Sequence, residues 1–271
     1  MEFAIIIWDV NPEIFRIGNF APRWYGVLFA LGFLFGYFIF KKIFRNEGLK
    51  DEVLDRLTIY MAIGTIVGAR LGHCLFYEPS YYLSDPIEIL KIWRGGLASH
   101  GAAIGILFVL WLFVRKEKKP YIWILDRIVI VVALGGALIR LGNLMNSEIY
   151  GVETTLPWGF VFLRAGETVP RHPTQIYEAL AYFITFIILY RIYWRKKGEF
   201  ISGLPFSLFL ILVFTFRFLV EFVKEDQVAF ESGMALNMGQ WLSLPFILLG
   251  VAGLVISLRR HKAGSREQGA G

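Results

Sequence analysis

Residues 122–145, IWILDRIVIVVALGGALIRLGNLM, decide the fold of this chain. The stretch is almost continuously apolar, and a helix of about 20 such residues crosses roughly 30 Å of hydrocarbon. Ionisable groups inside a membrane span are candidates for function because their insertion is unfavourable. The stretch therefore predicts a transmembrane helix and marks Arg140, near its end, as a candidate functional residue.

Six similar stretches lie on either side of this one, and together they predict seven transmembrane helices. Their approximate limits are residues 24–41, 57–76, 98–114, 122–145, 176–194, 203–223 and 241–258. The composition agrees, since 56% of the 271 residues are hydrophobic and only 18% are charged, against about 25% in soluble domains. We expect an all-α polytopic membrane protein, built as a single integral membrane domain over residues 1–271.

The connection over residues 146–175 differs from the spans. Its glycines and prolines are too frequent for a long helix and predict a folded loop or short strands, which contribute to a small outward-facing head. Residues 1–23 have no basic start ahead of an apolar run, so no cleavable signal peptide is expected. The tail, about residues 263–271, is small and polar and is expected to be disordered.

Lysine and arginine residues are unevenly shared between alternate connections. The connections after the first, third, fifth and seventh spans together carry 17 lysine and arginine residues, whereas the connections on the opposite side carry seven. Because such residues accumulate on the cytoplasmic side, we expect the N-terminus outside and the C-terminus in the cytoplasm.

Several kinds of chemistry are excluded by the residues present. Cys74 is the only cysteine, so the chain can form neither an internal disulfide nor a Cys-x-x-Cys site. No His-Glu-x-x-His motif or carboxylate set offers a metal site, and no glycine-rich loop follows a strand to bind nucleotide phosphates. The net charge of +6 arises from short clusters without a basic face, so nucleic acid is not an expected partner.

Glycines recur at helical spacing in three of the predicted spans. They are Gly64, Gly68 and Gly72; Gly32 and Gly36; and Gly101 and Gly105. Small residues at this spacing let helix backbones approach closely in lipid, so we interpret them as packing positions.

The first cluster of polar residues is at the end of the fourth span. Arg140 and Asn143 share a helical face, and the glycines around them loosen the backbone so that Asn146 and Glu148 can fold back toward them. The cluster predicts a cationic pocket at membrane depth, braced by amides and a carboxylate. An ion pair of Arg140 with Glu148 that only caps the helix is the structural alternative.

The second cluster is at the end of the sixth span. Arg217, Glu221 and Lys224 share one helical face, so Glu221 can orient Arg217 and neutralise part of its charge. Such an arrangement suits an anion that binds and leaves. A purely structural ion pair is again the alternative.

The third segment is the glycine-rich turn Gly95–Gly101, which contains His100. Histidine changes its charge near neutral pH, so a histidine at the membrane interface is a candidate general base. A structural histidine is the alternative. The three segments together indicate an arginine-lined site, open outward, for an anionic amphiphile, and they leave an enzyme and a transporter both open.

At these segments the chain resembles the bacterial phosphatidylglycerol–prolipoprotein diacylglyceryl transferase family, and the resemblance covers nearly its whole length. The family signature G-R-x-G-N-F-x-N-x-E-x-x-G is similar to residues 139–151, which end at Gly151. Further motifs in the family's order are Arg23-Trp24-Tyr25-Gly26, Gly68-Ala69-Arg70-Leu71-Gly72, the Gly95–Gly101 turn, Arg171-His172-Pro173-Thr174-Gln175-Ile176-Tyr177-Glu178, Arg217-Phe218-Leu219-Val220-Glu221-Phe222 and Gly239-Gln240-Trp241-Leu242-Ser243-Leu244-Pro245.

The chain departs from the family pattern at a few positions. Ile139 and Leu144 replace a glycine and a phenylalanine of the signature, which alters packing more than chemistry. Ala98-Ser99 stands where the family has Ser-Phe before the histidine. Lys224 stands where the family commonly has arginine, and a point charge in place of a planar fork makes a bidentate phosphate contact there doubtful.

The resemblance implies the first step of lipoprotein maturation. In that step the diacylglyceryl group of phosphatidylglycerol moves to the thiol of the lipobox cysteine in a prolipoprotein signal peptide, giving a thioether and glycerol phosphate. It also implies a multi-pass protein of the bacterial cytoplasmic (inner) membrane, with the lipid bilayer, phosphatidylglycerol and the prolipoprotein as partners. No metal and no organic cofactor are expected.

The resemblance also assigns roles to residues of the three segments. Arg140 and Arg217 are expected to stabilise the charge that develops on the leaving phosphate. His100 is expected to accept the thiol proton, and the alternative is that the arginines lower the pKa of the thiol. The residues expected to bind substrate or to orient the arginines are Tyr25, Asn143, Asn146, Glu148, Gly151, Tyr177 and Glu221.

A transporter or flippase for an anionic amphiphile is the alternative function. It would use the same arginines, but transporters of this kind are commonly built from repeats with paired discontinuous helices. The sequence shows no such repeats.

Overall fold

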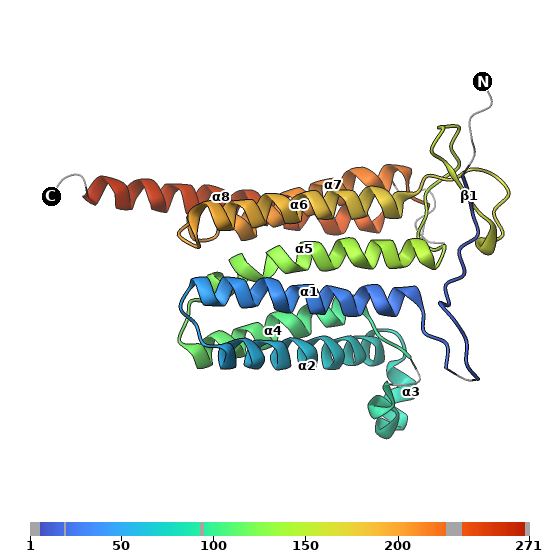
Figure 1. Ribbon diagram of the computed structural model, residues 1–271, viewed down its shortest axis with the longest axis horizontal. Coiled ribbons are helices and arrows are strands. Elements are labelled where there is room, and N and C mark those ends of the chain that lie inside the picture. The colour runs from blue at the N-terminus through green and yellow to red at the C-terminus, as the bar shows by residue number, and fades with distance from the viewer. Residues whose placement is uncertain (1–5, 19, 93–94, 226–234, 269–271) are drawn as a thin grey trace. The chain divides into compact units, whose positions relative to one another are not determined.

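The computed structural model describes residues 6–18, 20–92, 95–225 and 235–268, with the backbone alone for 264–268. Among the described residues, seven helices are long and apolar enough to cross a membrane, and each overlaps one predicted span (Figure 1). They are α1 (Trp24–Asn46), α2 (Asp51–Phe76), α4 (Ser99–Glu117), α5 (Tyr121–Met145), α6 (Thr174–Lys196), α7 (Leu204–Val220) and α8 (Met238–Gln268). The prediction of an all-α polytopic fold is confirmed.

Except for α7, which lies within its predicted stretch, the helices extend beyond the apolar stretches that predicted them. The largest difference at a start is in α2, which begins at Asp51, whereas the apolar stretch begins near residue 57. Asp51 and Glu52 lie in its first turn, where carboxylates are favourable beside the positive end of the helix dipole. Hydrophobicity alone does not detect such polar first turns.

The last helix also continues past its apolar part. The sequence predicts a disordered tail from about residue 263, but α8 is helical to Gln268, and residues 269–271 lie outside the described residues. Arginine, glutamate and glutamine in this stretch have high helix propensity, so an existing helix propagates through them.

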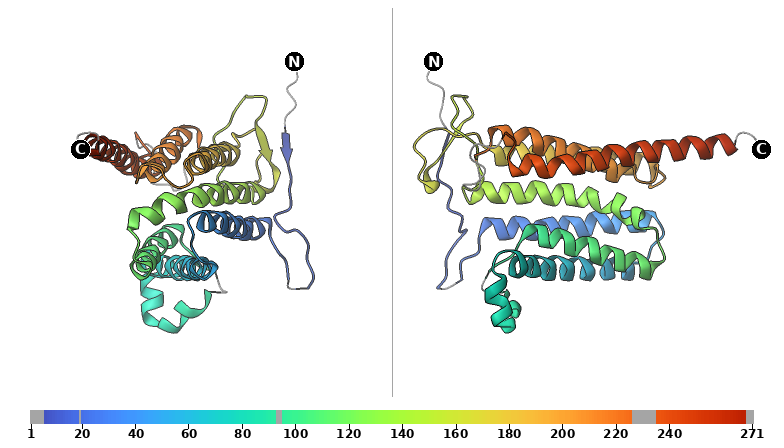
Figure 2. Two further views of the ribbon diagram at one scale, coloured as in Figure 1. Left: turned by 60° about the vertical axis from the view of Figure 1, so that its left-hand side comes forward. Right: turned by 180° about the vertical axis from the view of Figure 1, so that it is seen from behind.

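The chain forms two compact units, one of Met1–Ile39 and Leu125–Gly271 and the other of Phe40–Ile124. In the first unit, α7 packs against both α6 and α8. The strand β1 (Ile6–Trp8) and the end of α8 lie at opposite ends of these helices (Figure 2). The start of α7 is fixed by Asp126 of α5, whose carboxylate accepts hydrogen bonds from the backbone nitrogens of Gly203 (2.8 Å) and Phe206 (3.1 Å).

The long loop after α5 is folded, as the sequence predicts. Its strand β2 (Phe160–Phe162), which the short 3-10 helix η3 (Leu163–Ala165) follows, pairs in parallel with β1, with Ile6 opposite Phe160. Trp8 donates its indole N–H to the carbonyl oxygen of Leu144 at 3.0 Å. The loop and the N-terminal strand therefore form one small structure on the end of α5.

In the second unit, α2 and α4 pack closely through their glycines. A Cβ atom on Gly68 would lie 2.8 Å from the Cα of Gly105, and one on Gly72 would lie 2.6 Å from the Cα of Gly101. Real Cβ atoms do not approach so near, so any larger residue would force the helices apart. The interpretation of these glycines as packing positions is confirmed.

The connection after α2 contains two short helices, α3 (Pro79–Ser84) and η1 (Pro86–Leu90). Arg70, which is buried in α2, holds this connection through its guanidinium. It donates hydrogen bonds to the backbone oxygens of Glu88 (2.5 Å), Ile89 (2.8 Å) and Gly95 (2.7 Å). Arg70 therefore organises the loop that leads to His100.

Candidate functional site

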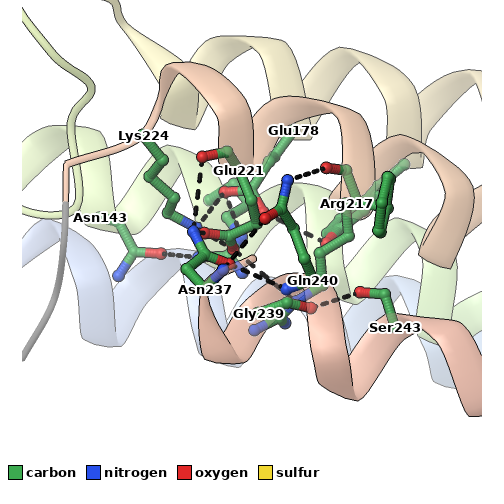
Figure 3. A network of polar contacts seen from close by, with 12 residues as sticks. Asn143, Glu178, Arg217, Glu221, Lys224, Asn237, Gly239, Gln240 and Ser243 are labelled. Atoms are coloured by element: carbon green, nitrogen blue, oxygen red, sulfur yellow. Dashed lines mark hydrogen bonds and ion pairs between the residues drawn. The ribbon is translucent and has the colours of Figure 1, made fainter. Parts of the chain in front are cut away.

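A layer of polar side chains lies at one end of the first unit, where α5 and α7 end and α6 and α8 begin. Each of these helices contributes a residue within about a turn of that end: Arg140 from α5, Glu178 from α6, Arg217 from α7 and Gln240 from α8. Figure 3 shows much of this layer, including the side chains that meet around Glu178 and Glu221.

Arg140 is held by a carboxylate that the sequence analysis did not assign. Its Nε lies 3.1 Å from Oε2 of Glu178, whose side chain is completely buried. Its Nη1 donates to Oδ1 of Asn143 at 3.4 Å. Arg140 is thus fixed in place with only 14% of its side chain exposed, and its partner is Glu178, whereas the structural alternative had paired it with Glu148.

Glu148 instead gathers the amides of the first cluster. Its Oε1 accepts hydrogen bonds from Nδ2 of Asn143 (2.8 Å) and Nδ2 of Asn146 (3.1 Å), as the sequence predicts from their spacing. Gln175 of α6 donates to the backbone oxygen of Glu148 at 2.7 Å. Within the described residues, Oδ1 of Asn146 and Oε1 of Gln175 are buried without a hydrogen-bond partner. The cluster therefore retains two free acceptors.

Glu221 lies in the short 3-10 helix η4 (Glu221–Val223), which follows α7. Its carboxylate is 3.2 Å from Nζ of Lys224 and 3.1 Å from Nδ2 of Asn237. Arg217 approaches it less closely, with Nε 3.9 Å from Oε1, and 33% of the arginine side chain is exposed. Arg217 is therefore the most loosely held and most accessible cation of the layer.

Lys224 joins the two carboxylates of the layer. Besides its contact with Glu221, its Nζ lies 3.5 Å from Oε2 of Glu178, and only 4% of the side chain is exposed. An ammonium engaged in this way has little capacity left for a phosphate. The doubt about a phosphate contact at this position is thus supported by geometry, and the lysine instead neutralises two buried carboxylates.

The start of α8 packs against Glu221. Asn237 and Gln240 exchange hydrogen bonds between side chain and backbone at 3.0 and 2.9 Å, which caps the helix. A Cβ atom on Gly239 would lie 2.5 Å from the carboxylate carbon of Glu221. Glycine at this position therefore lets α8 pack close to Glu221, and a larger residue would displace the Glu221 carboxylate.

The backbone of Gly151 contacts both the segment before α6, at His172, and the segment after η4, at Lys224. Its N–H donates to the carbonyl oxygen of His172 at 2.8 Å, and it forms an isolated antiparallel bridge with Lys224. A Cβ atom there would lie 2.8 Å from Cγ2 of Thr174. These contacts explain the glycine by close packing, and its predicted part in binding substrate stays a prediction.

The two tyrosines assigned to the substrate lie at the edge of the layer. Tyr25 of α1 packs on Gly142, where a Cβ atom would lie 2.8 Å from the tyrosine ring. The hydroxyl of Tyr177 accepts a hydrogen bond from the indole N–H of Trp158 at 2.8 Å and lies 3.2 Å from Nδ1 of His172. Burial lowers the pKa of His172, so the neutral imidazole is favoured there.

His100 belongs to the second unit and lies at the start of α4. Its exposed ring contacts Phe76 edge-on at a centroid distance of 5.4 Å and Tyr77 at 5.7 Å. The first unit holds Arg140 and Arg217, so a joint action of His100 with them stays a prediction.

Sequence reasoning missed Glu178, Asn237 and Gln240. Glu178 and Gln240 each lie within one of the family motifs. No charge pattern in the sequence links them to Arg140 or Arg217, because they are distant from those arginines in the chain. A buried carboxylate one residue after Tyr177, on a predicted span, was the available signal. Among the described residues, no group of three or more metal-ligating side chains occurs.

Comparisons with known proteins agree on one family. The family model described as prolipoprotein diacylglyceryl transferase matches residues 12–256. A protein of Tolumonas auensis named phosphatidylglycerol–prolipoprotein diacylglyceryl transferase is 49% identical over 256 residues, or 94% of this chain and 98% of that protein. Proteins with the same name from Chloroherpeton thalassium and Porphyromonas gingivalis are 45% and 46% identical, and each match covers at least 92% of both chains.

Proposed function

This chain belongs to the prolipoprotein diacylglyceryl transferase family, and on that premise we propose that it transfers the diacylglyceryl group of phosphatidylglycerol to prolipoproteins. The family match over most of the chain carries this conclusion. The polar layer of the first unit supports it, because a membrane protein that cleaves a phospholipid needs fixed cations at the depth of the lipid phosphate. This reaction is the first step of lipoprotein maturation.

The acceptor in this proposal is the thiol of the lipobox cysteine. Its sulfur attacks the glycerol carbon that carries the phosphate ester, so a carbon–sulfur bond forms and the carbon–oxygen bond breaks. The electron pair of the broken bond leaves on the oxygen of glycerol phosphate, and the thiol proton passes to a base. The products are a thioether and glycerol phosphate.

The two arginines have different parts in this mechanism. Arg140, fixed by Glu178 and Asn143, provides a preorganised positive charge at the layer. Arg217 is accessible and only loosely paired with Glu221, so it can turn to the phosphate when the lipid enters. Charge that develops on the leaving oxygen is stabilised strongly where water is excluded. The carboxylates of Glu178 and Glu221 offset two of the three positive charges of Arg140, Arg217 and Lys224 in the absence of substrate.

The glycerol head group fits the free acceptors of the first cluster. The hydroxyls of glycerol are hydrogen-bond donors, and Oδ1 of Asn146 and Oε1 of Gln175 are buried acceptors that lack a partner among the described residues. A buried polar atom without a partner is unfavourable, so a ligand that satisfies both gains affinity. Tyr25, which packs on Gly142, and Tyr177, two residues after Gln175 on α6, provide the remaining hydroxyls of the proposed head-group site.

The mechanism needs a group that accepts the thiol proton. His100 is exposed at the start of α4 and is our candidate. The alternative is that the arginines lower the thiol pKa from about 8.5 far enough for the thiolate to form without a dedicated base. A His100→Asn variant that transfers at the wild-type rate would favour the alternative.

We place the reaction at the outer leaflet of the bacterial cytoplasmic membrane. The loop over residues 146–173 lies at the same end of the first unit as the polar layer, opposite to the end of α8 (Figure 2). The distribution of lysine and arginine assigns that end to the outside. A signal peptide delivered by the secretion machinery presents its cysteine on this side.

The test is transfer by the purified protein. We expect mass spectrometry to detect a diacylglyceryl group on a lipobox peptide incubated with phosphatidylglycerol, and none on the same peptide with serine in place of cysteine. Arg140→Ala and Arg217→Ala are expected to abolish transfer while the protein stays folded in the membrane. No product from folded wild-type protein would instead favour the transporter hypothesis, which a lipid-flux assay in vesicles then tests.

A further inference from the structure

A groove runs along the first unit between α6 and α7, outside the polar layer. Its volume is about 410 Å³, and its walls are almost entirely apolar. The lining residues are Tyr177, Leu180, Ala181, Ile184, Thr185, Ile188, Leu212 and Phe216. Of these residues, the mechanism described above uses only Tyr177.

The shape of the groove follows from the residues at helical spacing on α6. Leu180 and Ile184 are exposed along its rim, whereas Ala181 and Thr185 are small and leave the space between the two helices. The hydroxyl of Thr185 donates to the carbonyl oxygen of Ala181 at 2.8 Å, so its polar group is satisfied within the helix. The groove therefore offers its occupant mainly apolar contacts, and the hydroxyls of Thr185 and Tyr177 already have partners.

The length of the groove along α6 corresponds to the thickness of one leaflet of a membrane. From Tyr177 to Ile188 the helix rises about 16 Å at 1.5 Å per residue. Half of the hydrocarbon core is about 15 Å. A groove of this depth matches an acyl chain that enters from one leaflet and runs toward the midplane.

The end of the groove at Tyr177 and Phe216 lies at about the same depth along the helices as the polar layer. Tyr177 directly precedes Glu178 on α6, and Phe216 directly precedes Arg217 on α7. A phospholipid whose phosphate lies at Arg217 therefore has the top of this groove beside its glycerol. An apolar groove that begins at the depth of Arg217 suits a diacyl lipid, whose phosphate and acyl chain are adjacent in the same molecule.

We propose that the groove between α6 and α7 binds one acyl chain of the phosphatidylglycerol substrate, and that its depth determines the preferred chain length. This inference rests on the proposed function and adds a site for the apolar part of the substrate. The remaining chain lies outside the groove, in contact with other parts of the protein or with lipid.

The experiment uses substitutions that narrow the groove from α6 or from α7. Ala181→Phe narrows it from α6 and Leu212→Trp from α7, and Ala252→Phe, at an exposed position on α8, is the matched control. Each purified variant receives a lipobox peptide with an equimolar mixture of dilauroyl and dipalmitoyl phosphatidylglycerol. Mass spectrometry of the peptide then gives the ratio of the two products.

We expect both groove variants to shift the product ratio toward the shorter chain, and Ala252→Phe to keep the wild-type ratio. If the narrowed groove excludes two or three methylene groups of the longer chain, the free energy of burying each methylene group predicts a shift in the product ratio of about ten- to fiftyfold. An unchanged ratio in both variants, or an equal loss of both products, would overturn the proposal. Either result would mean that the groove holds only surrounding membrane lipid.

A second measurement separates this proposal from the proposed function. Phosphatidylglycerol with a photoreactive group midway along one acyl chain is expected to label residues 180–188, and Ala181→Phe is expected to reduce that labelling. Equal labelling by phosphatidylcholine with the same chain would overturn the proposal. Absence of transfer by the wild-type protein contradicts the proposed function, and the labelling still decides whether the groove selects this lipid.

Discussion

Glu178 is the residue on which the polar layer depends. Its carboxylate is completely buried and contacts Arg140 of α5 at 3.1 Å and Lys224 after η4 at 3.5 Å. Two cations from distant parts of the chain therefore share one anion. Removal of one member of a buried charge group leaves the others without compensation, which is far more unfavourable than the loss of a surface pair.

We predict that Glu178→Gln lowers the free energy of unfolding by about 3 kcal/mol and strongly reduces transfer. Thermal unfolding in detergent and the peptide transfer assay measure the two effects. The control is Glu153→Gln, at an exposed position of the loop after α5, which is expected to change neither quantity. Wild-type stability together with wild-type transfer in Glu178→Gln would show that Glu178 does not hold Arg140 in place.

His172 gives the loop after α5 a pH dependence. Burial lowers its pKa in the folded chain, so below the ordinary pKa of about 6.5 the unfolded chain binds more protons. This contribution to stability is complete above that pH and is lost as the pH falls from there toward the folded pKa. We predict that the melting temperature of the wild type falls more steeply with acidification than that of His172→Gln. Parallel curves for the two proteins would refute this assignment.

At the scale of elements, the close contact of α2 with α4 has a direct test. A Cβ atom on Gly105 would lie 2.8 Å from the Cα of Gly68, whereas one on Gly26 of α1 would meet no atom within 4 Å. We expect Gly105→Ala to lower stability by about 1–3 kcal/mol through overpacking. Gly26→Ala is expected to keep or raise it, since alanine reduces the entropy of the unfolded chain. Equal melting temperatures for the two variants would show that the helices separate without penalty.

For the whole molecule, the orientation in the membrane is the property to measure. Cys74, the only natural cysteine, is completely buried, so a new cysteine can be labelled against a silent background. We expect a membrane-impermeant maleimide to label Thr155→Cys, in the loop after α5, when applied from outside the cytoplasmic membrane. Lys116→Cys, near the end of α4, is expected to react only after the cells are opened. The reverse pattern would invert the proposed topology.

The sequence by itself determined the helices and most of the residues of the polar layer. A membrane span is encoded locally, because each helix satisfies its own backbone hydrogen bonds and must be apolar over about 20 residues. The seven helices could therefore be predicted, as could the contact of Asn143 and Asn146 with Glu148, which lie within a few residues of one another. The helix ends were less predictable because their polar turns lie outside the hydrocarbon.

Only the tertiary structure decided which charges are partners. Arg140 pairs with Glu178, 38 positions along the chain, and not with the nearby Glu148. Lys224 contacts two carboxylates, and sequence spacing predicts only one of them. Glu221 is one helical turn away, whereas Glu178 is on another helix. The groove beside the layer likewise exists only where the small residues of α6 meet α7. Such contacts depend on how helices pack, and packing joins residues whose distance in the sequence carries no information about their distance in space.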